Sequence, residues 1–193
     1  MNPIRILAVD DDLDFRYLLT QMLLGQPDLE LAAVCATAQE GCAAAARLQP
    51  DIVLMDLELI GSYTDGADAA RRIRMQTTAR VLILTADDNP ETVIRASVHA
   101  FASGYVLKSQ ASMLLPTIRE TATGPTPQSH LICAALLQAL TVAERAVLRQ
   151  MLGQEVQLYS SAKTIANQHT SVLHKLGLPD RNMLRHIFAA YLS

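Results

Sequence analysis

Side chains able to bind a metal ion or a phosphoryl group follow short apolar runs in the first part of the chain. In order they are Asp10, Asp11, Asp12, Asp56, Thr85 and Lys108. Crowded carboxylates repel one another unless a cation compensates them, and Mg²⁺ accepts carboxylates together with water and phosphate oxygens. Lys108 adds a positive charge for a phosphoryl oxygen, and a carboxylate such as Asp56 can form an acyl phosphate. These residue types predict Mg²⁺-dependent phosphoryl transfer to Asp56.

Five apolar runs, each followed by a segment with helical spacing, must position these side chains. The runs are Ile4–Val9, Leu29–Cys35, Ile52–Met55, Val81–Leu84 and Tyr105–Leu107, and the expected helices are Leu13–Gly25, Thr37–Leu48, Ala67–Arg74, Glu91–Ala102 and Met113–Glu120. Unbroken apolar runs are typical of strands buried on both faces, and their alternation with helices predicts a doubly wound, five-stranded parallel α/β sheet. Ligands bind at the carboxyl ends of such strands, where the polar residues stand.

Each polar residue also has a structural explanation when it is taken alone. Asp12 precedes the helix Leu13–Gly25 and is a suitable cap for it. Thr85 is compatible with an ordinary strand end, and Lys108 with a solvated surface position. Their joint placement at four strand ends favours a common site.

Net charge divides the chain near residue 129. Residues 1–129 contain 10 Lys and Arg against 16 Asp and Glu, a net charge of −6, whereas residues 130–193 contain 6 against 3, a net charge of +3. Between them, Thr121–Ser129 has no large apolar residue and two prolines, which is typical of a linker. We expect domains at residues 1–122 and 140–193, joined by a linker and linker helix over 123–139.

The basic second part shows four helical segments. Leu131–Leu140 is the expected linker helix, and Thr141 with Glu144 forms a capping box for Val142–Leu152. Lys163–Leu176 and Arg181–Leu192 follow. The last helix has an apolar face that suits either a core or a partner subunit, formed by Leu184, Ile187, Phe188 and Tyr191.

Composition excludes several classes of protein. The three cysteines, Cys35, Cys42 and Cys133, share no metal or redox spacing and are typical of reduced thiols. Aromatic residues make up 4% of the chain and Trp is absent, which argues against a stacking platform for single-stranded nucleic acid. There is neither a signal peptide nor an apolar run long enough to span a bilayer, so we expect a cytoplasmic protein with no membrane contact.

The first part resembles the receiver domain of bacterial two-component response regulators. The matching segments are Ile6–Asp12, Pro50–Leu57, Asp65–Gly66, Val81–Ala86 and Gly104–Lys108, in the family's order. The resemblance implies a sensor histidine kinase as phosphodonor and no enzymatic activity beyond self-phosphorylation and dephosphorylation. The implied roles are a Mg²⁺ site of Asp10, Asp11, Asp56 and the Glu58 backbone carbonyl, Asp56 as phosphoacceptor, Lys108 as phosphate-binding lysine, and Thr85 with Tyr105 as switch pair.

The implied switch has a simple physical basis. A phosphoryl group brings about −1.5 to −2 charge, which Thr85 can move to satisfy, and Tyr105 then turns into the vacated space. The loop Leu59–Gly66 departs from the family because it is longer and lacks a proline. We expect altered phosphoryl lifetime or metal affinity. The acid Glu58 either discourages phosphate approach or faces solvent.

The second part resembles the LuxR/NarL-type helix-turn-helix output domain, on the segments Leu140–Leu148 and Lys163–Leu178. The resemblance implies a recognition helix in the major groove of double-stranded DNA, control of transcription, and a homodimer when phosphorylated. The residues implied to face DNA are Lys163, Thr164, Asn167, His169 and Lys175.

The segment between these two matches is shorter than in the family. It should hold the first helix of the motif, but Gln154–Ala162 leaves room for about one helical turn at 1.5 Å rise per residue. Val156, Leu158 and Tyr159 are candidates to fill the gap. Because the charge is only +3, we expect a weak salt dependence of DNA binding. One alternative is an output domain that binds a protein partner, and another is a phosphoryl relay with a vestigial tail. A third is a phosphatase-like hydrolase that uses Asp56, which the lack of a second catalytic acid placed like Asp56 disfavours.

Overall fold

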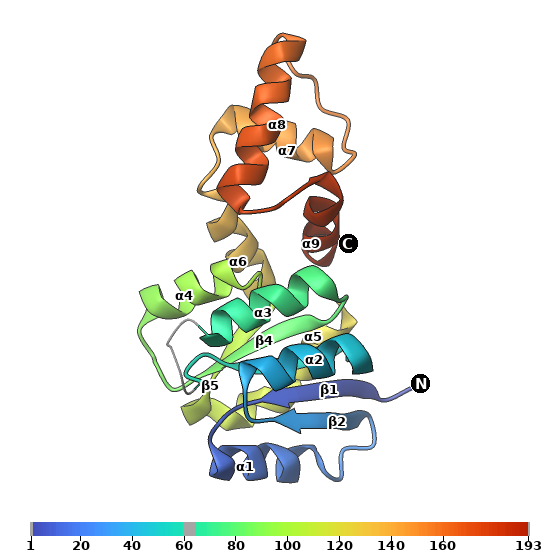
Figure 1. Cartoon of the computed structure of the whole chain (residues 1–193), viewed down its shortest axis with the longest axis vertical. Coiled ribbons are helices and arrows are strands. Elements are labelled where there is room, and N and C mark those ends of the chain that lie inside the picture. Colours follow the sequence, from blue (N-terminus) through green and yellow to red (C-terminus); the bar gives the residue numbers. More distant parts are fainter. Residues whose placement is uncertain (1, 60–64, 193) are drawn as a thin grey trace.

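A computed structural model of the chain describes residues 2–59 and 65–192 (Figure 1). Its five strands form one parallel sheet in the order β2-β1-β3-β4-β5. The strands are β1 (Ile4–Val9), β2 (Leu29–Cys35), β3 (Ile52–Asp56), β4 (Arg80–Thr85) and β5 (Gly104–Leu107). The helices of this unit are α1 (Leu13–Leu23), α2 (Ala38–Leu48), α3 (Asp65–Gln76), α4 (Pro90–His99), the 3₁₀ helix η1 (Lys108–Met113) and α5 (Leu114–Thr123). The doubly wound α/β fold is confirmed.

Both faces of the sheet are buried, which explains why the strands read as unbroken apolar runs. Alternate side chains of a strand point to opposite faces. One face contributes Leu7, Val9, Val53, Met55, Val81 and Ile83 to a core. The other contributes Ile6, Ala8, Ile52, Leu54, Leu82 and Leu84 to a second core.

Local caps fix several helix starts. The Asp12 carboxylate accepts hydrogen bonds from the backbone N–H groups of Asp14 at 2.9 Å and Phe15 at 3.2 Å. The capping explanation of Asp12 is therefore correct. Thr37 caps α2 and Asn89 caps α4 in the same way. These caps satisfy N–H groups that a helix leaves unpaired at its start.

The helix α6 (Pro127–Leu137) begins inside the segment predicted as a linker, while α5 extends to Thr123. Thr126 caps α6 in a capping box with Ser129, and Pro127 occupies the first helical position, where a missing N–H costs nothing. Gln128 Oε1 accepts the backbone N–H of Tyr105 on the edge strand β5 at 3.0 Å. Pro127, one of the two prolines that indicated a linker, thus lies in the first turn of a helix that is fixed to the sheet.

Three further helices form the C-terminal part: α7 (Val142–Met151), α8 (Ala162–Leu176) and α9 (Arg181–Leu192). The capping box of Thr141 and Glu144 is present. The stretch from 152 to 161 contains no helix, so the space that the sequence left for about one helical turn is not used for one. Leu158 packs against the C-terminal core, whereas Tyr159 is 90% exposed and fills no gap.

The chain is elongated, with α6 and α9 between the sheet unit and the pair α7 and α8 (Figure 1). The apolar face of α9 is buried in a core that includes Phe101 of the sheet unit. Tyr191 on α9 donates a hydrogen bond to the Ala102 carbonyl at 3.0 Å, and burial raises the pKa of its hydroxyl. The face of α9 therefore packs within the chain. None of the described helices is both long and apolar enough to cross a bilayer.

Candidate functional site

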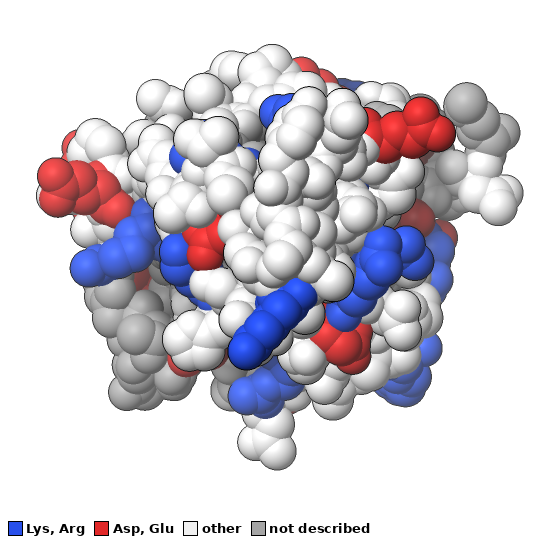
Figure 2. Space-filling model, turned by 90° about the horizontal axis from the view of Figure 1, so that it is seen from above, with Lys and Arg blue, Asp and Glu red and all other residues white. Residues whose placement is uncertain are grey.

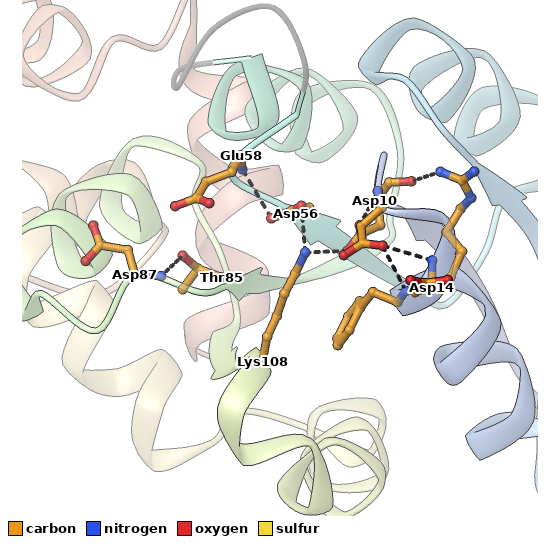
Figure 3. A network of polar contacts seen from close by, with 10 residues as sticks. Asp10, Asp14, Asp56, Glu58, Thr85, Asp87 and Lys108 are labelled. Carbon is orange, nitrogen blue, oxygen red and sulfur yellow. Dashed lines mark hydrogen bonds and ion pairs between the residues drawn. The ribbon is translucent and has the colours of Figure 1, made fainter.

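The structure brings Asp10, Asp56, Thr85 and Lys108 together at the carboxyl ends of the strands (Figure 3). Asp10 and Thr85 are fully buried, and Asp56 is 2% exposed. Lys108 Nζ lies 2.8 Å from Asp10 Oδ2 and 2.8 Å from Asp56 Oδ2. One ammonium group therefore bridges two buried carboxylates from neighbouring strands.

Backbone and ring contacts hold these side chains in place. Asp10 Oδ1 accepts the N–H of Asp12 at 2.9 Å, and Asp56 Oδ1 accepts the N–H of Glu58 at 3.1 Å. The ring of Phe15 lies 4.6 Å from Lys108 Nζ, a cation–π contact. The site is thus preorganised by the backbone of two loops and by Phe15 of α1, which was not among the predicted residues.

Close packing against the backbone of Asp56 explains why a glycine follows Asp65. A Cβ atom at Gly66 would overlap the Asp56 carbonyl oxygen and lie 2.8 Å from Leu57 Cα. Only glycine allows the start of α3 to approach the backbone beside Asp56 this closely. Part of the unusual loop before it, residues 60–64, lies outside the described residues.

Burial and the contacts between Lys108 and the aspartates shift the pKa values of the site in opposite directions. Burial raises the pKa of Asp10, the hydrogen bond from Lys108 lowers it, and the charge of Asp56 raises it again. Burial also lowers the pKa of Lys108, but its contacts with both aspartates outweigh burial and raise it. The site therefore holds two carboxylates whose repulsion Lys108 compensates only in part.

The residues present fit a Mg²⁺ ion. Asp10, Asp11 and Asp56 offer carboxylate oxygens that all lie within 4.8 Å of one another. An oxygen-only set with uncompensated negative charge is the chemistry that this hard cation prefers. The Glu58 carbonyl as a further ligand stays a prediction, and the Glu58 side chain is exposed, in agreement with a solvent-facing acid.

The two residues predicted as a switch pair lie on β4 and β5. The Thr85 hydroxyl accepts the N–H of Asp87 at 3.0 Å (Figure 3). Tyr105 is half-buried beside the core of the sheet unit. Its backbone N–H is the group held by Gln128 of α6, a contact missed because the segment was interpreted as a linker.

The five residues predicted to face DNA divide into two groups along α8. Lys163, Thr164 and Asn167 are exposed in its N-terminal half, which points away from the sheet unit (Figure 1). The Nε2 atom of His169 is buried without a hydrogen-bond partner among the described residues. Lys175 Nζ binds Glu144 Oε2 of α7 at 2.7 Å. The first three are thus available to a ligand, whereas His169 has a buried ring nitrogen and Lys175, although exposed, is paired with Glu144.

Charged side chains are sparse on this end of the molecule. Figure 2 shows Lys and Arg as separate groups, with Asp and Glu between them and a large uncharged area. The face in view has no continuous basic band. This agrees with the weak salt dependence expected for DNA binding.

Replacing Glu144 by Gln should reduce stability in a pH-dependent way. Hydrogen bonds from Lys175, Ser171 and Thr141 lower the pKa of Glu144 from 4.5 to about 2. Because the pKa of Glu144 is lower in the folded protein, its ionised carboxylate stabilises the fold above about pH 4.5. This contribution is lost as the pH falls toward 2. Because Lys175 is partly exposed, we expect Glu144→Gln to lower the free energy of unfolding at pH 7 by about 1–2 kcal/mol.

Denaturant unfolding at several pH values measures this difference. The exposed Glu155 provides a control, since Glu155→Gln should stay close to the parent protein. A difference between parent and Glu144→Gln that stays constant down to pH 2 would contradict the role of the carboxylate charge.

A parallel sheet in the order 2-1-3-4-5, with clustered aspartates and a lysine at its carboxyl edge, defines a receiver domain. The family described as response regulator receiver domain matches residues 6–119, and the chain belongs to that family. The chain is 29% identical to the transcriptional regulatory protein LiaR of Bacillus subtilis, over 92% of this chain and 93% of the relative.

Solved structures of similar fold match this chain, one of them over both of its parts. A two-component response regulator of the LuxR family from Aurantimonas sp. SI85-9A1 is 32% identical, with a TM-score of 0.60, and covers 71% of this chain and 97% of its own. RcsB from Salmonella enterica serovar Typhimurium, bound to promoter rprA, is 20% identical, has a TM-score of 0.57 and covers 97% of this chain and 99% of its own. At that identity RcsB supports the fold alone. The protein is a response regulator of the LuxR/NarL type.

Proposed function

We propose that a sensor histidine kinase phosphorylates Asp56 and that the phosphorylated protein controls transcription in the cytoplasm by binding DNA through α8. The observation that carries the receiver part is the position of Lys108 Nζ, 2.8 Å from both Asp10 and Asp56. The same ammonium group that compensates the carboxylates is placed to bind an incoming phosphoryl oxygen.

The chemistry follows from these positions. The Asp56 carboxylate forms a bond to phosphorus while the bond from phosphorus to the donor nitrogen breaks, and Lys108 donates a hydrogen bond to a phosphoryl oxygen. When bound at Asp10, Asp11, Asp56 and the Glu58 carbonyl, Mg²⁺ supplies charge that stabilises the phosphoryl oxygens. The Thr85 hydroxyl, which accepts from Asp87 in this structure, can rotate toward the new phosphoryl group.

The route from the receiver to the output passes through β5 in this proposal. Tyr105 belongs to the predicted switch pair, and its backbone binds Gln128 of α6. A movement of Tyr105 on phosphorylation therefore shifts α6, which packs against α4 and β5. Released C-terminal helices then bind DNA as a homodimer, with Lys163, Thr164 and Asn167 as the exposed contacts.

Selection of genomic DNA fragments by the full chain tests this function, with and without acetyl phosphate and Mg²⁺ at two salt concentrations. We expect a common sequence among the recovered fragments and loss of retention in Asp56→Ala and in Lys163→Ala. Recovery of no sequence above background, from protein shown to be folded and phosphorylated, would contradict DNA as the ligand.

The structure also favours a second candidate, an output domain that binds a protein. No helix occupies residues 152–161, so α8 lacks the brace that a helix-turn-helix normally has. The absence of a continuous basic band among the described residues on the face that carries α8 also favours a protein partner over DNA (Figure 2). If the partner is a protein, the DNA selection recovers no common sequence. Phosphorylation of Asp56 still changes the set of proteins that bind to the chain.

A further inference from the structure

An open cavity of about 470 Å³ lies where the receiver meets the C-terminal helices. It is lined by residues of α3, α4, α6 and α8 and by Gly177. Five of the nine lining residues are basic: Arg71, Arg95, His99, His174 and Lys175. No aspartate or glutamate belongs to this lining within the described residues. The size falls within the range of small-molecule sites, which is about 300–1,000 Å³.

The basic groups come from both sides of the domain boundary. Arg71 donates hydrogen bonds to the His99 carbonyl at 2.7 Å and to the Gly177 carbonyl at 2.6 Å, and it stacks on Phe101 at 4.3 Å. These hydrogen-bond partners are uncharged, and the charged group that acts on Arg71 is the carboxylate of Asp68. Arg71 therefore fixes the distance between α3 and the end of α8 and adds charge to the cavity.

The remaining basic side chains differ in whether they already have an acidic partner. Lys175 binds Glu144, and His99 binds Asp68 at 2.6 Å. Across the described residues, the side chains of Arg95 and His174 have neither a hydrogen bond nor an ion pair, and both are exposed. The cavity thus has a free guanidinium on the receiver side and a free imidazole on the α8 side.

We propose that this cavity binds a small phosphorylated ligand, a phosphomonoester or diphosphate, that bridges the receiver and α8. The free Arg95 suits two phosphoryl oxygens at once, and His174 and Lys175 meet the same anion from the other domain. A ligand that contacts both domains stabilises the docked arrangement over the undocked one. It therefore acts on the output independently of Asp56.

Calorimetric titration of the full chain with pyrophosphate, without Mg²⁺ and with a chelator, tests the site. We expect Arg95→Gln and His174→Gln each to weaken binding by about tenfold, because each removes one charge-assisted contact. Arg149→Gln removes an exposed cation of α7 outside the cavity and should bind as the parent does. In parallel, pyrophosphate should raise the unfolding temperature of the parent more than that of Arg95→Gln.

Two results would overturn the proposal. One is the absence of pyrophosphate binding up to about 10 mM, since a built site for a multiply charged anion should bind at least that well. The other is binding that survives Arg95→Gln and His174→Gln but is lost in Lys108→Ala. That pattern would place the anion at the Asp56 site.

Discussion

Asp56→Asn should abolish incorporation of a phosphoryl group from acetyl phosphate and Mg²⁺. The amide is not a nucleophile comparable to the carboxylate, and no other described aspartate contacts Lys108 except Asp10, which is fully buried. We expect a loss of at least about a hundredfold in the amount of acyl phosphate, since the nucleophile itself is removed. Intact-mass spectrometry after a fixed incubation measures the phosphorylated fraction.

Two neighbouring substitutions make this result specific. Glu58→Gln should leave phosphorylation near the parent level, because the exposed Glu58 side chain is not required and its backbone is retained. Asp11→Asn should weaken Mg²⁺ binding, so that phosphorylation needs a higher Mg²⁺ concentration, since it removes one of three clustered carboxylates. Full phosphorylation of Asp56→Asn at another residue would show that the bridging lysine does not mark the acceptor.

The receiver site was predictable because its residues stand directly after buried strands. Once Ile52–Met55 and Val81–Leu84 are recognised as neighbouring parallel strands, Asp56 and Thr85 must meet at one edge. Local sequence also fixes the caps, such as Asp12 and the box of Thr141 with Glu144. In each case the residue and its partner are near in the chain or related by strand pairing.

Contacts between the two parts of the chain could not be predicted in this way. Gln128 binds the edge of β5, and Arg71 binds the carbonyl of Gly177, more than a hundred positions away. A glutamine or arginine on an exposed helix has many possible partners, and its own spacing selects none. The sequence alone is likewise compatible with either a core or a second subunit against the apolar face of α9. The structure shows that this face packs in a core with Phe101 of the receiver.

Arg74 on α3 is buried where the receiver meets α9. Its side chain is 2% exposed and donates hydrogen bonds to the carbonyls of Phe101 at 3.2 Å, Ala79 at 2.8 Å and Ile187 at 3.5 Å. Burial lowers its pKa, and carbonyl dipoles rather than a carboxylate compensate its charge. His186 of α9 completes the junction by binding the Arg74 carbonyl at 2.9 Å.

Arg74→Ala should therefore lower the free energy of unfolding by about 3 kcal/mol, through unsatisfied buried carbonyls and a cavity, less the relief of a buried charge. Arg74→Met keeps most of the volume and should cost about half as much, which separates packing from hydrogen bonding. Denaturant unfolding of the full chain measures both. Arg72→Ala, on the exposed side of the same helix, should change stability by less than about 0.5 kcal/mol. Equal stability of Arg74→Ala and Arg72→Ala would contradict the inference that the buried contacts of Arg74, including the one to Ile187 of α9, stabilise the fold.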